Sequence, residues 1–89
     1  MLKVIYSNKF KKDFKLIKKR GYCISKLEEI FRLLASESEL PEKYRDHALT
    51  GDLIGFRELH ISPDWLLVYK VENTDLILAR TGTHSDLFR

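Results

Sequence analysis

The chain has 89 residues, of which 44% are hydrophobic, so it can form one small core but not a second domain. Its longest apolar run, Trp65 to Tyr69, is far shorter than the roughly 20 residues of a membrane-spanning helix, and its first residues do not resemble a signal peptide. Its one cysteine, Cys23, excludes an internal disulfide framework and a multi-cysteine zinc site. We therefore expect a single soluble, cytoplasmic domain over residues 1–89, with no membrane partner.

The net charge of +3 is unevenly distributed. Residues 1–20 contain eight basic residues and one acidic residue, Asp13, whereas residues 21–89 contain eight basic and twelve acidic residues. A local charge of +7 is typical of a segment that binds a polyanion, because clustered lysines neutralise neighbouring phosphates. A solvated helix face has the same composition, so charge alone does not decide between the two. The candidate RNA-binding residues of this segment are Lys9, Lys11, Lys12, Lys15, Lys18, Lys19 and Arg20.

The first twenty residues predict a strand followed by a helix. β-Branched and aromatic residues favour a short strand over residues 2–6. Ser7 or Asn8 can cap a helix that runs to about Arg20, and Gly21 can end it with a positive φ angle. The spacing i, i+4, i+7 predicts a buried stripe on this helix, formed by Phe10, Phe14 and Ile17.

A second helix is predicted directly after the first. Ser25 and Glu28 have the spacing of a capping box, and apolar residues repeat with a helical period until about Ser36. The apolar residues of this face are Leu27, Ile30, Phe31 and Leu34. Residues 37–51 have no regular pattern, so we expect a loop of about 15 residues, a length at which a functional role is more common than a simple connection.

Three strands are predicted in the rest of the chain. Residues 55–61 alternate, residues 65–71 are almost continuously apolar, as in a central strand, and residues 75–80 follow a turn. The turns lie at 62–64 and 72–74. The order β-α-α-β-β-β predicts an α+β fold in which a helical hairpin covers one face of a small, mostly antiparallel sheet.

All three histidines lie in loops or at predicted strand ends, where rigid scaffolds often carry functional residues. His47 is in the long loop, His60 ends the first of the three strands, and His84 follows the last. In an antiparallel meander the end of the first strand, the start of the second and the end of the third meet at one end of the sheet. His47 joins them if its loop folds back. The other residues expected at this end are Asp64, Trp65 and Arg80.

Each of these residues alone is more often an ordinary surface or core residue, but their convergence favours a site. The histidine spacing matches no zinc-ligand framework, and the G-x-S-x-G motif of serine hydrolases is absent. Metal-independent RNA cleavage fits better, since it needs a general base for the ribose 2′-hydroxyl, a general acid for the departing 5′-oxygen and a fixed positive charge. Histidine suits both proton transfers and arginine suits the phosphate, while Trp65 or Phe88 can stack on an unpaired base.

Three blocks in the second half of the chain carry a family resemblance. They read D-H-x-L-x-G from Asp46, H-x-x-P-D-W from His60, and R-x-G-[TS]-H-x-x-L-F from Arg80. Together they resemble the YafQ-like branch of the RelE superfamily, and the similarity extends over essentially the whole chain. Members of this branch are toxins of bacterial type II toxin–antitoxin systems that act as ribosome-dependent mRNA interferases. The chain differs from the pattern in having Arg89 after the terminal Phe88, which adds a charge near the site.

The resemblance implies a RelE-like fold, an mRNA substrate in the ribosomal A site, and a cognate antitoxin, of the DNA-binding DinJ or RelB type. It implies that Arg80 holds the cleaved phosphate, and that Trp65 and Phe88 shape the mRNA-binding surface. We expect His84 to be the general acid, with the base drawn from His47, His60 or Asp64. The basic residues of the first helix are then expected to contact rRNA.

Two other functions remain open from the sequence. ParE-like toxins share the fold order and poison DNA gyrase, but they lack the histidine set. A non-catalytic RNA-binding module would use only the basic helix. The three functions predict different effects of expression: arrest of translation through cut mRNA, arrest of replication, or no effect.

Overall fold

The computed structural model describes residues 1–88, and the expected effect of Arg89 lies outside this range. The predicted strand-helix-helix beginning is confirmed, and the described chain also contains a short strand, a short C-terminal helix and two 3₁₀ turns. In chain order the elements are β1 (Lys3–Tyr6), α1 (Asn8–Lys19), α2 (Ile24–Ala35), η1 (Glu42–Tyr44), β2 (His47–Ala48), η2 (Gly51–Leu53), β3 (Arg57–Ser62), β4 (Trp65–Glu72), β5 (Asp75–Gly82) and α3 (His84–Leu87).

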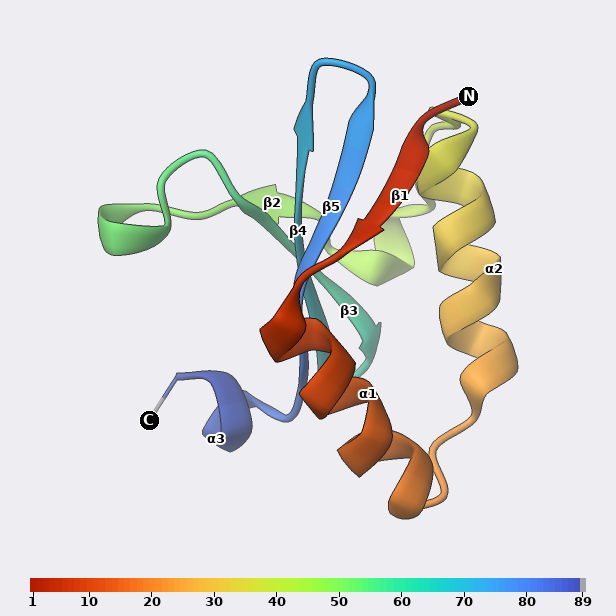
Figure 1. The fold of residues 1–89 in the computed structure, drawn as a ribbon, viewed down its shortest axis with the longest axis vertical. Coiled ribbons are helices and arrows are strands. Elements are labelled where there is room, and N and C mark those ends of the chain that lie inside the picture. The colour runs from red at the N-terminus through yellow and green to blue at the C-terminus, as the bar shows by residue number, and fades with distance from the viewer. Residues whose placement is uncertain (89) are drawn as a thin grey trace.

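The strands form one sheet in the order β1-β5-β4-β3-β2. β1 is parallel to β5, and the other neighbours are antiparallel. Figure 1 shows α1 and α2 on one side of this sheet and α3 at its other side, near the C-terminus. The predicted α+β architecture, a helical pair over one face of a mostly antiparallel sheet, is therefore confirmed.

The two long helices begin in different ways. Ser7 caps α1, because its hydroxyl accepts the amide of Phe10 at 3.0 Å and donates to the carbonyl of Ala79 at 2.8 Å. Gly21 then turns the chain with φ of 84°, as predicted. The capping box predicted for α2 is wrong: the helix begins at Ile24, so its N-cap is Cys23, two residues before Ser25, and Cys23 makes no side-chain capping bond.

The main core lies between the helices and the sheet. Its largest fully buried side chains come from both layers and include Phe10, Ile17, Leu27, Ile30, Leu59, Leu67, Leu76 and Leu78. Aromatic contacts join α1 to α2, with the ring centroids of Phe10 and Phe31 6.0 Å apart, and β1 to α2, with those of Tyr6 and Phe31 6.4 Å apart. Within residues 1–88 no helix is long and apolar enough to span a membrane.

The opposite face of the sheet, which we call the site face, is also partly covered. Leu66 and Val68 of β4 point to it and are only 1% and 2% exposed. Phe56 and Phe88 line a common cavity with Val68, so segments before β3 and after β5 shield this face. Burial on both faces explains why β4 is almost continuously apolar.

The segment predicted as a loop is more ordered than expected. It contains η1, β2 and η2, and β2 pairs with the start of β3. A two-residue strand has no detectable period in the sequence, so the pattern predicts a loop at His47 where the structure has a sheet edge.

Candidate active site

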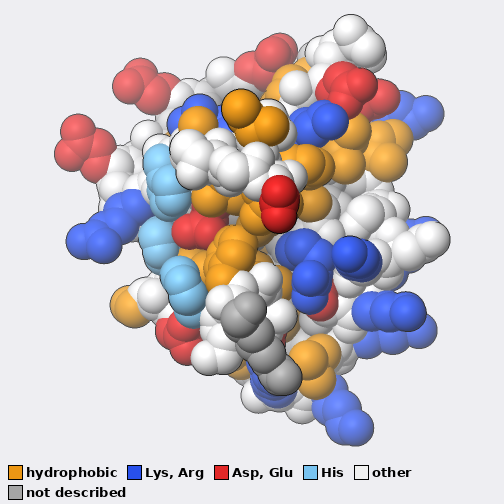
Figure 2. Space-filling view, turned by 90° about the vertical axis from the view of Figure 1, so that its left-hand side faces the viewer, with side chains coloured by type: hydrophobic (Ala, Val, Ile, Leu, Met, Phe, Trp, Pro, Cys, Tyr) orange, Lys and Arg blue, Asp and Glu red, His pale blue; other side chains and the backbone are white. Residues whose placement is uncertain are grey.

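The strand register brings the predicted site segments together at one end of the sheet. His60 lies opposite Leu66, and Leu66 lies opposite Gly82, two residues before His84. Residues paired in this way share a face, so His60 and the chain leading to His84 lie on the site face. Figure 2 shows the histidine side chains in a row on this side of the molecule, with hydrophobic and acidic side chains between them and a group of basic side chains further across the same face. The predicted convergence of the three histidines therefore occurs.

His47 joins the row through strand pairing. It lies opposite Glu58 in the β2–β3 ladder, and its ring stacks with that of His60 at a centroid distance of 6.2 Å. Its Nδ1 lies 2.8 Å from the carbonyl oxygen of Arg45, and its Nε2 lies 3.6 Å from a carboxylate oxygen of Glu58. Glu58 is only 5% exposed, whereas the His47 side chain is about half exposed.

These contacts determine how His47 can carry a proton. A carbonyl oxygen only accepts hydrogen bonds, so Nδ1 of His47 must be the donor to Arg45. The neutral ring then has its lone pair on Nε2, beside Glu58. Nε2 is therefore the ring nitrogen that can accept a proton. This arrangement suits a general base.

A second set of contacts holds β2 against β3. Asp46, next to His47, accepts a hydrogen bond from the hydroxyl of Tyr69 at 2.6 Å and from Nε of Arg57 at 3.2 Å. Burial, together with the hydrogen bond to Asp46, raises the pKa of Tyr69, so its hydroxyl stays protonated as a donor. Tyr69 is a core residue of β4, and the His47 backbone is thus fixed to the rigid part of the sheet.

His84 is positioned by three sets of contacts around the start of α3. Thr83 and Asp86 form a capping box, and Asp86 also pairs with Arg20 at 2.7 Å. Asp64 accepts the backbone amide of His84 at 3.2 Å, which connects the β3–β4 turn to α3. Gly82 has φ of 152°, and a Cβ there would lie 3.0 Å from the Asp86 carboxylate, so this close approach requires glycine.

Arg80 is held by the first helix. Its Nε donates to Oδ2 of Asp13 at 2.6 Å and its Nη2 donates to Oδ1 at 3.1 Å, while Asp13 also accepts the amide of Thr81 at 3.2 Å. The hydrogen bond to Asp13 raises the pKa of Arg80, so the guanidinium remains charged. Its Nη1 makes no hydrogen bond with a described residue and is available to a phosphate.

The two aromatic residues predicted to bind mRNA differ in position. Phe88 lies on the site face with its ring centroid 5.3 Å from that of His84, and with Arg80 it lines a cavity of ≈ 350 Å³. Trp65 is 3% exposed, and its indole N–H donates to Thr81 at 2.9 Å inside the core. The prediction that Trp65 stacks on a base is therefore contradicted by its burial. An apolar strand start is as typical of core as of a binding surface, and here the core explanation holds.

The basic residues of α1 are exposed, as an rRNA-binding surface would require. Arg20 differs from the lysines, because its ion pair with Asp86 gives it a structural role in holding α3. Among residues 1–88, no group of three or more His, Cys, Asp or Glu side chains is arranged to hold a metal ion.

Several functional side chains were not identified from the sequence. Asp13, Glu58, Asp46 and Asp86 each position a residue of the site through a contact between distant parts of the chain. Asp13 was visible as the single acid in a basic segment, and Glu58 as an acid sharing a strand face with His60. Asp46 is the acid beside His47 that opens the D-H-x-L-x-G block, but the sequence does not indicate its partners, and nothing in the sequence singles out Asp86.

A helical pair on one face of a mixed sheet, with histidines and an arginine at one end of the other face, defines a RelE-like α+β toxin domain. Residues 2–89 match the sequence family described as "Bacterial toxin of type II toxin-antitoxin system, YafQ", and the chain belongs to this family. The family predicted from the three sequence blocks is thus confirmed.

Individual relatives agree with this assignment. The chain is 43% identical over 84 residues to "mRNA interferase toxin YafQ" of Escherichia coli K12, covering 93% of this chain and 91% of the relative. The E. coli DinJ–YafQ complex matches with a TM-score of 0.92 and 40% identity over the full length of both chains. A copper-bound mutant toxin from Helicobacter pylori matches with a TM-score of 0.95 and 43% identity, covering 99% of this chain and 100% of that one.

Proposed function

We propose that this protein is a ribosome-dependent endoribonuclease toxin that cleaves mRNA in the ribosomal A site through metal-independent general acid–base chemistry. The observation that carries the proposal is the row of three histidines on the site face, in which His47 has its Nδ1 2.8 Å from the Arg45 carbonyl oxygen and its Nε2 3.6 Å from the buried Glu58 carboxylate. The YafQ-family membership and the name of the E. coli relative support the same activity. Poisoning of gyrase and passive RNA binding would give the histidine row no role.

In this mechanism His47 is the general base. Its Nε2 removes the proton of the ribose 2′-hydroxyl, and the 2′-oxygen attacks the adjacent phosphorus. The P–O5′ bond breaks, and His84 gives its proton to the departing 5′-oxygen. The products are a 2′,3′-cyclic phosphate and a free 5′-hydroxyl.

The other residues of the candidate site bind the RNA or orient the two histidines. The free Nη1 of Arg80 faces the negative charge that grows on the phosphate oxygens, where a fixed cation lowers the barrier. Phe88 beside His84 provides a ring for an unpaired base. His60 stacks on His47, and Asp64 holds the amide of His84, so we assign both to positioning rather than to proton transfer.

The ribosome and an antitoxin complete the proposal. The site has few groups and cannot hold free mRNA in a reactive geometry, whereas the A site can present a splayed codon, and positioning is worth several kcal/mol in general. The toxin therefore acts in the cytoplasm, where ribosomes are. A DinJ- or RelB-like, DNA-binding antitoxin neutralises it, through an acidic segment that folds on the basic surface.

The test is cleavage of ribosome-bound mRNA by His84→Ala and His47→Gln variants. Each should lower the single-turnover rate by about 10²–10⁴-fold while the melting temperature changes little, because both side chains are exposed. Lys3→Ala, on the opposite edge strand β1, is the control. A folded His84→Ala protein that cleaves at the wild-type rate would exclude His84 from the mechanism.

A further inference from the structure

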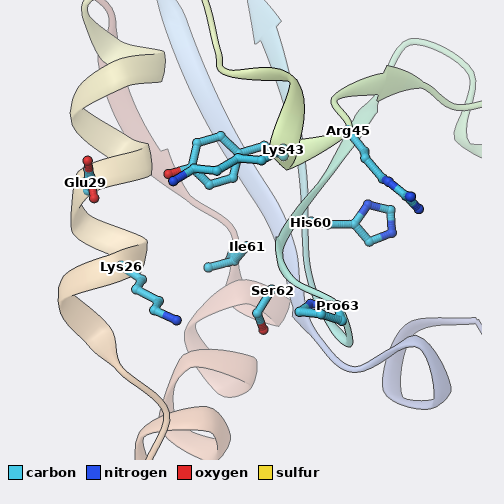
Figure 3. Close-up of a pocket in the computed structure, with 9 residues that line it drawn as sticks. Lys26, Glu29, Lys43, Arg45, His60, Ile61, Ser62 and Pro63 are labelled. Atoms are coloured by element: carbon cyan, nitrogen blue, oxygen red, sulfur yellow. The ribbon is translucent and has the colours of Figure 1, made fainter.

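A second cavity lies beside the histidine row, on the side of α2. Its volume is ≈ 580 Å³, and it lies between α2, the η1 turn and the end of β3 (Figure 3). β2 pairs only with Arg57 and Glu58, so β3 from His60 to Ser62 has no strand beside it at this edge. The cavity therefore runs along an open strand edge.

The cavity has an excess of positive charge. Lys26 of α2, Lys43 of η1 and Arg45 after η1 line it, against one acid, Glu29. None of the three cations makes an ion pair with a residue between 1 and 88, and Nζ of Lys43 lies over the Tyr44 ring at 5.1 Å. Like charges that share a cavity without counterions repel one another, and a bound anion relieves this repulsion.

One polar group that lines the cavity has no protein partner. The hydroxyl of Ser62 belongs to a partly exposed residue and forms no hydrogen bond with residues 1–88. A ligand with hydrogen-bonding groups of its own can bond to it. His60 Nδ1 also has no partner among the described residues, but this atom is buried, so it is not a contact for a ligand in the cavity.

His60 connects this cavity to the candidate active site. It lines the cavity, and its ring stacks on that of His47 in the histidine row. Figure 3 shows the side chains of His60 and Arg45 next to each other at one end of the cavity, with Lys26 projecting from α2 at the other. A strand of RNA that crosses the row at His47 would enter the cavity next.

We propose that this cavity binds one unpaired nucleotide of the mRNA, adjacent to the phosphodiester bond that is cleaved. Arg45 faces its phosphate at the end next to the histidine row, Lys26 and Lys43 face the neighbouring phosphate, and the Ser62 hydroxyl bonds to one of its polar groups. The volume is within the usual range for small-ligand sites, about 300–1,000 Å³. The proposal rests on the proposed function and deepens it, because a base held here makes the cleavage rate depend on sequence beside the cut.

The first experiment measures binding without cleavage. The probe is a single-stranded RNA hexamer with 2′-O-methyl groups at every position, which has no attacking hydroxyl. Backbone amide signals of Lys26, Lys43 and Ser62 should shift on titration. The variant is Lys26→Ala combined with Arg45→Asn, since Arg45 has φ of 50° and asparagine tolerates this conformation.

The double variant should bind the hexamer about tenfold or more weakly, and the salt slope should fall by about 1.4 because two phosphate-facing cations are lost. Lys3→Ala, which removes one exposed cation on the far edge of the sheet, should bind as wild type does. Unshifted amides in the cavity, or equal affinity of the double variant, would overturn the proposal.

The second experiment tests whether the cavity binds mRNA or rRNA. It also distinguishes failure of this proposal from failure of the proposed nuclease function. On ribosomes programmed with mRNAs that differ only in the nucleotides beside the cut, wild-type rates should vary and the double variant should reduce this variation. Weaker ribosome binding by the double variant with unchanged hexamer binding would mean that the cavity binds rRNA, which contradicts the proposal. Hexamer binding in the cavity without cleavage on any ribosome would leave the nucleotide site standing and refute the nuclease function.

Discussion

The Asp13 carboxylate lies 2.6 Å from Nε and 3.1 Å from Nη2 of Arg80, so the one acidic residue among the first twenty orients the arginine of the candidate site. The same carboxylate accepts the amide of Thr81. This pairing leaves the Nη1 edge of the guanidinium pointing away from α1. Through Asp13 the basic helix is coupled directly to the place where we expect the phosphate.

Asp13→Asn should therefore impair catalysis more than binding. The amide keeps the size of the side chain but loses the charge and one accepting oxygen, so Arg80 is less firmly oriented. Small displacements of a catalytic group can cost up to about 10²-fold in rate. We expect the single-turnover cleavage rate on ribosomes to fall by about 10–10²-fold. The dependence of this rate on ribosome concentration, which reports binding, should change little.

Asp52→Asn is the matched control for this prediction, because Asp52 is an exposed carboxylate of η2. It should leave both the rate and the concentration dependence unchanged. If Asp13→Asn lowers only the melting temperature, Asp13 is a structural residue and does not position Arg80 for catalysis.

Sequence patterns predicted the members of the site better than its internal contacts. Hydrophobic alternation and the order of the strands were enough to predict that His60, Arg80 and His84 lie at one end of the sheet. The partners of these residues could not be predicted in the same way, since Asp13–Arg80 and Arg20–Asp86 join positions more than 60 residues apart. Trp65 was wrongly predicted to stack on a base. The sequence does not reveal that the hydroxyl of Thr81 on β5 accepts a hydrogen bond from its indole inside the core.

The contacts of Asp86 predict that the stability of the protein depends on pH. Its hydrogen bonds with Arg20 and with the Thr83 amide hold the pKa of its carboxyl well below the ordinary value of 3.8. In the unfolded chain this group takes up a proton first as the pH falls, so its contribution to stability is complete above about pH 3.8 and is lost progressively below it.

Asp86→Asn should accordingly lower the free energy of unfolding at pH 7, and the difference from wild type should shrink as the pH falls below 3.8. Urea unfolding at several pH values measures this difference directly. A difference that stays constant between pH 7 and pH 2.5 would show that the ion pair does not stabilise α3.

The basic helix gives a third prediction. Reversing Lys11, Lys15 and Lys18 to glutamate should weaken ribosome binding and make the remaining binding less sensitive to salt, because phosphate contacts are lost. The histidine row should be unaffected. Arg20→Gln should instead loosen α3 through Asp86 and reduce the cleavage rate. Equal ribosome affinity of the triple variant and wild type would mean that the helix is only a solvated face.

The fold was predictable where the periodic pattern is long, and less so where elements are short. α1, α2 and β4 each have at least eight residues, and their patterns placed them correctly. β2 and α3 have two and four residues and owe their conformation to partners elsewhere in the chain. β2 is held by the β3 ladder and by the bonds from Arg57 and Tyr69 to the adjacent Asp46, and α3 is held by Arg20 and Asp64. These two short elements carry His47 and His84, so the least predictable parts of the fold hold the proposed base and acid.

The central claim is that the 2′-hydroxyl of the mRNA attacks its own phosphodiester bond. The most direct test is cleavage of ribosome-bound mRNA in which the nucleotide on the 5′ side of the cut has a 2′-deoxyribose, compared with the all-ribose message, and with the new 3′ end analysed. We predict that the all-ribose message is cut to leave a 2′,3′-cyclic phosphate and that the substituted message is not cut at that position. Cleavage of the substituted message at the same position, or a free 3′-hydroxyl at the cut, would contradict the mechanism.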